Sequence, residues 1–203
     1  MSLAKVLPMS FVMIAGPQIL SAIFLATTEK WRQDSAAFVG GAALSITAVC
    51  TIAFFLSTGA SDRGASGNTL DIVFLVLLVA AGLHTFLTRK TSTPPKWMGG
   101  LESAQPKRSF TLGFLLLGVF PTDILTSFAV GGYLARHNDP WWHLLPFVLL
   151  TALLLALPSL LIVALGKRGQ ALLPKVRDWM NDNSWVVSEI VIGLFVVIIA
   201  SSL

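Results

Sequence analysis

Charged residues are scarce in this chain of 203 residues. They make up only 12% of it, whereas apolar residues make up 55%. Soluble domains carry about 25% charged residues. Together with a mean hydropathy of +0.78, this balance excludes an ordinary soluble domain and indicates an integral membrane protein. The net charge of +4 is small, and we expect no nucleic-acid partner.

Several chemical motifs are also missing. The only cysteine is Cys50, which excludes an intramolecular disulfide and a thiol-pair redox cycle. No G-x-x-x-x-G-K-[ST] loop is present, so the chain is not by itself an ATP-driven pump. No His, Cys or carboxylate cluster has the spacing of a metal site, and no Ser-His-Asp arrangement stands out. We expect no enzyme activity, no cofactor and no bound metal.

Long apolar runs are what the sequence does contain. A helix needs roughly 20 apolar residues to span a bilayer, and the runs are continuous rather than alternating as in barrel strands. We therefore expect an all-α integral membrane protein, and we read the first run as a retained span rather than a cleaved signal. The expected spans are six: about 6–28, 35–57, 70–88, 110–135, 141–165 and 184–203.

The basic residues predict the orientation of these spans. Eleven of the fourteen Lys and Arg residues fall in the connections after the first, third and fifth spans, and only Lys5, Arg63 and Arg136 fall on the other side. Positively charged connections stay in the cytoplasm. Both termini should therefore face outward. All six tryptophans lie in connections or near span ends, as expected for an interfacial belt.

The polar connection at 89–109 divides the expected transmembrane domain, 1–203, into halves 1–88 and 110–203. Each half has three spans, so the halves should have opposite orientations. This is the arrangement of a 3+3 inverted repeat, common in transporters. A loose internal echo favours it, because "GPQILSAIF" in the first span resembles "FPTDILTSF" in the fourth after a one-residue shift.

Two prolines interrupt the corresponding spans. Pro17 and Pro121 each remove a helical hydrogen bond, and interrupted helices in two halves point to a central transport site. The alternative is a pair of simple kinks. Asp123 lies in the same apolar run, where an acid costs roughly 2.5 to 3.5 kcal/mol on insertion scales. We expect it to couple transport to protons, with Gln18 and Thr122 as polar companions. The alternative is a structural acid that caps backbone freed near Pro121.

Two further residues are weaker candidates for the same substrate and proton-coupling site. Glu189 lies early in the last span, where it can instead reach the interface or pair with a base. His84 lies near the cytoplasmic end of the third span, where an interfacial hydrogen bond is the alternative to a proton relay. In the second span Ala37, Gly41 and Ser45 recur every four residues, a spacing that allows close helix packing.

Three segments resemble a known family. They are "GPQILSAIFLATTEKW", "GVFPTDILTSFAVGG" and "LLPKVRDWMNDNSWVVSEIVIGLFVVIIASSL", which together extend over most of the chain. The sequence is similar to the peptidoglycolipid addressing protein (GAP) or Sap-like family of the LysE exporter superfamily. Members often have Asn-Pro where this chain has Phe120-Pro121. The resemblance implies six helices, inverted symmetry and export of cell-envelope glycolipids or related amphiphiles.

Three functions remain open at this point. The first is a secondary exporter or accessory translocator of an amphiphilic envelope lipid in the cytoplasmic membrane. The second is a LysE-type exporter of amino acids, cations or other small solutes. The third is a non-transporting scaffold for an envelope-assembly complex. The expected partners are membrane lipids, the transported amphiphile or small molecule, a second copy in a homodimer, and an envelope-biosynthesis protein.

The topology can be tested by cysteine labelling. A cysteine at Met98, in the long basic connection, should react with a membrane-impermeant maleimide only after the membrane is opened. A cysteine at Arg63, in the opposite connection, should react in intact cells. Labelling of position 98 from outside would overturn the expected orientation.

Overall fold

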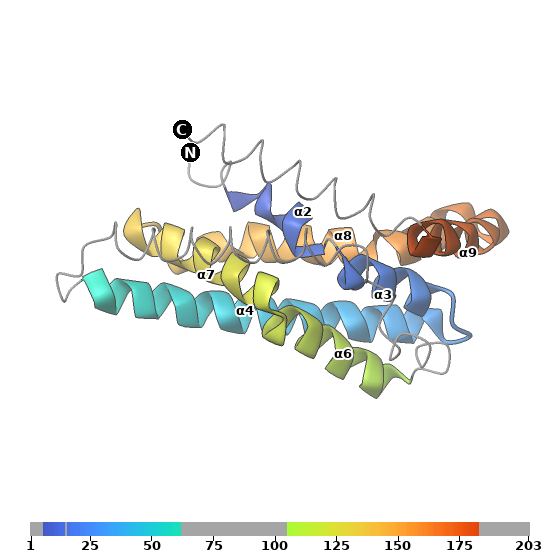
Figure 1. Ribbon diagram of the computed structural model, residues 1–203, viewed down its shortest axis with the longest axis horizontal. Helices are drawn as coiled ribbons and strands as arrows, with labels where there is room; N and C mark the ends of the chain where they lie inside the picture. The colour runs from blue at the N-terminus through green and yellow to red at the C-terminus, as the bar shows by residue number, and fades with distance from the viewer. Residues whose placement is uncertain (1–5, 15, 62–104, 183–203) are drawn as a thin grey trace.

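The computed structural model describes residues 6–14, 16–61 and 105–182, and these residues form helices (Figure 1). The all-helical class expected from the sequence is confirmed for them. The elements, in chain order, are α2 (Met9–Ile14), α3 (Pro17–Ala26), α4 (Trp31–Ser61), α6 (Pro106–Val119), α7 (Pro121–Arg136), the 3-10 helix η3 (Trp141–His143), α8 (Leu144–Leu165) and α9 (Lys167–Asp182).

Two helices are long and apolar enough to cross a membrane unaided. They fall within α4 and across η3 and α8, at Trp31–Thr58 and Trp141–Leu165. They correspond to the expected spans at 35–57 and 141–165. Many large apolar side chains on them are exposed, with Leu149 and Val163 each 66% accessible. A lipid-facing surface explains this exposure, since such residues are usually buried in soluble proteins. A multi-pass membrane protein follows.

The expected first and fourth spans are both interrupted. The first consists of α2 and α3, which are separated at Gly16. The fourth consists of α6 and α7, which meet at Phe120 with a bend of 66° and form a third span if counted together. Helix α6 begins at Pro106, slightly before the expected boundary at 110. The expected spans at 70–88 and 184–203 lie outside the described residues, so the six-helix repeat stays a prediction.

Contacts along α4 give the directions of the helices. Gly41 of α4 lies against Phe110 and Phe114 of α6, and Cys50 of α4 lies against Gly131 of α7. Residue numbers at the contacts increase in the same direction along α4 and along α6 and α7. Helix α4 is therefore parallel to α6 and α7. Helices α3 and α8 run the other way, because their C-terminal ends lie beside the start of α4 and beside α9 (Figure 1).

One end of the molecule therefore collects the basic residues. It holds the end of α3, the starts of α4 and α6, the end of α8 and all of α9 (Figure 1). We call it the basic end, and it is defined by Lys30, Arg32, Lys107, Arg108, Lys167 and Arg168. These are residues that the sequence assigned to cytoplasmic connections.

Glycine and serine let α4 and α6 approach closely. A methyl group added at Gly41 would meet the Phe110 carbonyl, one added at Gly113 would meet the Phe38 carbonyl, and Gly118 faces Ser45. Close packing was expected along Ala37, Gly41 and Ser45, and it is confirmed at Gly41 and Ser45. Gly40, by contrast, has nothing near its open side.

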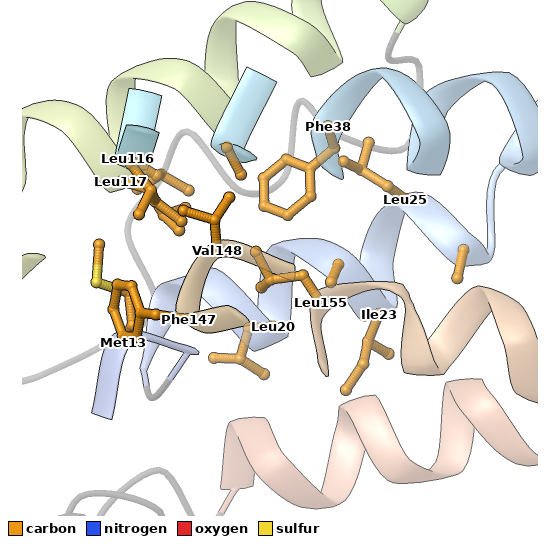
Figure 2. Close-up of a cluster of buried hydrophobic side chains, with 14 of the residues drawn as sticks. Met13, Leu20, Ile23, Leu25, Phe38, Leu116, Leu117, Phe147, Val148 and Leu155 are labelled. Carbon is orange, nitrogen blue, oxygen red and sulfur yellow. The ribbon is translucent and has the colours of Figure 1, made fainter. Parts of the chain in front are cut away.

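The apolar core lies where the short helices pack on the long ones. Figure 2 shows Met13 and Leu20 of α2 and α3 beside Phe147 and Val148 of α8, with Phe38 of α4 close by. Met13, Phe38 and Phe147 are fully buried. The broken first span is therefore packed inside the helix bundle, which positions Gln18 in its interior.

Helix α9 was not foreseen, because the sequence reading assigned Lys167–Arg177 to a connection. Gly166 turns the chain out of α8 with a φ of 56°. Gly169, Leu173 and Val176 recur at helical spacing; Gly169 and Leu173 are buried and Val176 is packed against the core. Leu172 and Trp179 are exposed. This pattern is typical of an amphipathic helix at a membrane interface, and it was the signal available in the sequence.

The glycine packing predicts opposite effects at two adjacent positions. Gly41→Ala should lower stability by about 1–3 kcal/mol, because α4 and α6 must move apart to admit the methyl group. Gly40→Ala should be neutral or stabilising by up to about 1 kcal/mol, because its space is open and alanine favours the helix. Thermal unfolding in detergent, followed by circular dichroism, measures both. Equal midpoints for the two variants would contradict the close crossing.

Candidate functional site

Two helix starts meet inside the bundle. Gly16 has a φ of 99°, a backbone conformation that suits glycine, and Pro17 then begins α3. Phe120 is extended, and Pro121 begins α7. Proline suits the first position of a helix because it has no N–H that needs a partner there. Each proline thus ends one helix and starts the next, as expected from the interrupted pattern.

Gln18 and Asp123, just after these prolines, are hydrogen-bonded to each other. Gln18 Nε2 donates to Asp123 Oδ2 over 2.6 Å, and both residues are only 1% exposed. A buried carboxyl group needs such a donor, since an unpaired one loses its hydration without compensation. Gln18 Oε1 is buried as well and has no hydrogen-bond partner among the described residues. The pair joins the start of α3 to the start of α7.

The two helix starts share more than this pair. Ser21 Oγ donates to the Pro17 carbonyl over 2.6 Å, and Thr126 Oγ1 donates to the Thr122 carbonyl over 2.8 Å. Both bonds run from a small hydroxyl residue to the fourth residue before it. Gln18 and Asp123 are 105 positions apart, and so are the members of the other two pairs: Pro17 with Thr122, and Ser21 with Thr126. The local geometry around the two breaks is thus alike.

The site lies well inside the apolar layer. Helix α3 has 10 residues and is therefore about 15 Å long. Its last residues lie at the basic end. The hydrocarbon core of a bilayer is about 30 Å thick, so Gln18 and its partner are about half a membrane from that end.

Among the described residues no three His, Cys, Asp or Glu side chains are placed to hold a metal ion.

The remaining predicted site residues do not join this pair in the described structure. Thr122 is half-buried, and its carbonyl accepts the bond from Thr126. Pro121 is exposed. The hydrogen bond described for the Asp123 carboxyl group goes to Gln18, and the capping role near Pro121 stays an alternative. Glu189 and His84 lie outside the described residues.

Sequence reasoning missed a second buried acid, Asp34, at the basic end. Its side chain is fully buried. Thr28 Oγ1 donates to Asp34 Oδ2 over 2.8 Å, and Ser109 Oγ donates to Asp34 Oδ1 over 3.4 Å. The acid thereby connects the start of α4 with the start of α6. Its place in the first turn of a helix was the only signal, and that is an ordinary position for aspartate.

Comparisons with known proteins identify the family. No curated protein and no solved structure matches the chain. The family model described as "Sap, sulfolipid-1-addressing protein" matches residues 6–203. That range takes in both helix breaks, the Gln18–Asp123 pair and α9. The resemblance found from the sequence is confirmed, and the chain belongs to the Sap (sulfolipid-1-addressing protein) family.

Proposed function

We propose that this protein is a secondary exporter, or the translocating part of a larger exporter, for an amphiphilic envelope lipid of the sulfolipid type. It would act in the cytoplasmic membrane. Family membership supports the lipid cargo, because the description of the family names a sulfolipid. The single observation that carries the mechanism is the buried Gln18–Asp123 hydrogen bond between two helix breaks.

The pair is suited to a carboxyl group that changes its protonation state. When Asp123 is ionised, it accepts a hydrogen bond from Gln18 Nε2, as in the structure. When it is protonated, its O–H can donate to Gln18 Oε1, which has no hydrogen-bond partner among the described residues. A glutamine amide offers both a donor and an acceptor. Rotation of the Gln18 amide by half a turn therefore presents a donor to the ionised acid or an acceptor to the protonated acid.

The helix breaks supply the movement. Helices interrupted near the midplane, one in each half, are where inverted-repeat transporters bind cargo and rock. The shared geometry of the two breaks supports a 3+3 repeat in which Gln18 and Asp123 hold equivalent positions. Equivalent residues of two repeats touch only near the axis that relates them. The proton-binding pair would then lie at the pivot between the halves.

Proton coupling predicts a separation between folding and export. Asp123→Asn keeps the size of the side chain and a hydrogen bond to Gln18, but it removes the titration. The variant should insert into the membrane and have the same unfolding midpoint as the wild type. The amount of envelope lipid in the outer extract should fall to the level found in deletion cells. Lipid extracts of the envelope and the cell interior, compared by mass spectrometry, measure this. Normal export by Asp123→Asn would refute the coupling.

Two control variants make the result specific. Asp139→Asn makes the same chemical change outside the site, where the acid lies near His143, and it should export normally. Asp123→Leu leaves the Gln18 amide without its partner and should cost about 1–3 kcal/mol of stability. If Asp123→Leu unfolds and Asp123→Asn still exports, the acid is purely structural.

If deletion cells retain their envelope lipids and lose a small exported metabolite, the lipid cargo is wrong.

A further inference from the structure

The basic end contains a pocket that the transport pair does not use. Its volume is about 240 Å³, and it is lined by Ala26, Thr27, Thr28, Trp31, Gln170 and Pro174. These residues come from the end of α3, the start of α4 and the middle of α9. Sites for whole small molecules are roughly 300–1,000 Å³. This pocket therefore suits the headgroup of a lipid rather than the entire molecule.

The pocket lies where a lipid headgroup would be. Helix α8 is a candidate span that ends at Leu165, and α9 begins two residues later. Helix α9 must therefore start at the membrane boundary. Its exposed Leu172 and Trp179 are of the kinds that enter the headgroup region of a bilayer. The wall of the pocket formed by Gln170 and Pro174 is thus part of an interfacial helix.

The hydrogen-bonding groups of the pocket favour a sugar. Thr27 Oγ1 donates to the Phe24 carbonyl over 2.7 Å, and the single proton of Thr28 Oγ1 is taken up by the Asp34 carboxylate at 2.8 Å or the Leu25 carbonyl at 3.0 Å. A hydroxyl has one proton but two lone pairs, so both threonines can still accept. Sugar hydroxyls can donate to them, whereas a sulfate ester or a phosphodiester group only accepts. The flat indole of Trp31 offers an apolar surface for a sugar ring.

The surroundings of the pocket favour a negative charge on that sugar. Residues 167–178 hold four basic residues and one acid, and residues 26–34 hold two of each. The Arg32 guanidinium lies 5.2 Å from the centre of the Trp31 ring. Lys167 precedes Gln170 by three residues and Pro174 by seven, so it shares their face of α9. The carboxyl group of Asp34 is hydrogen-bonded to Thr28 and Ser109.

We propose that this pocket is the loading site at which the protein takes up an anionic, sugar-bearing lipid headgroup from the cytoplasmic leaflet. The sugar lies between Trp31, the two threonines and Gln170, and its charged group faces Lys167 of α9. The lipid tails remain in the bilayer beside α8. This inference rests on the proposed lipid export and adds the place and the chemistry of cargo entry.

Protection of a cysteine in the pocket tests the proposal. In the full chain in phosphatidylcholine nanodiscs, Pro174→Cys places a thiol in the pocket without removing a polar group. Octyl glucoside 6-sulfate should slow its labelling by a maleimide about tenfold at about ten times the dissociation constant, because bound sites are shielded. Octyl glucoside should protect less, and octyl sulfate should not protect. The native Cys50 is buried and should not react.

Two matched variants decide between a pocket and general adsorption. Leu172→Cys lies on the exposed face of α9 and should not be protected by any probe. Adding Gln170→Leu to Pro174→Cys should weaken protection. Equal protection of positions 172 and 174, equal protection by octyl sulfate, or no protection at 174 would each overturn the proposal. The assay measures binding without transport, so Asp123→Asn should keep the protection even where export is lost.

Discussion

A carboxyl group placed in an apolar interior must have a hydrogen-bond partner, and this requirement organises the structure around Asp123. Its partner is Gln18, 2.6 Å away on the other interrupted span. Pro17 and Pro121 create the helix starts that bring the two side chains to the same depth. Because lipid offers no water to satisfy broken backbone, the short helices have to be packed inside the bundle, and the core around Met13, Phe38 and Phe147 does this.

The interrupted helices are joined to their neighbours by contacts that differ in kind. The crossing of α4 and α6 at Gly41 and Gly113 is tight and steric, and such contacts have little freedom to adjust. The contact between Gln18 of α3 and Asp123 of α7 is polar, and it can be exchanged for other hydrogen bonds. A cycle in which the basic end opens while α4 and α6 stay together is consistent with this division. Cargo entering beside α9 would then reach the buried pair through the same end.

Much of this arrangement could be predicted from particular residues. The proline breaks followed from the removal of a backbone donor, and the spans at α4 and α8 followed from run length. Gln18 was expected near Asp123 because each residue lies next to the proline that interrupts its span. Asp34 could not be found this way, because an aspartate in a first helical turn is common and its burial depends on α6, far along the chain. Helix α9 was missed because its charges were read as topology signals, although Leu172, Leu173, Val176 and Trp179 carry a helical period.

The central claim is that Gln18 and Asp123 hold each other inside the membrane, and a double-mutant cycle tests it most directly. Unfolding free energies are measured in detergent for Gln18→Leu, for Asp123→Leu and for the double variant. Each single change leaves a buried polar group unpaired, whereas the double change removes both groups. The double variant should therefore be more stable than the sum of the single effects predicts, by at least about 1 kcal/mol. Additivity within about 0.5 kcal/mol, the usual result for independent sites, would show that the two residues do not interact.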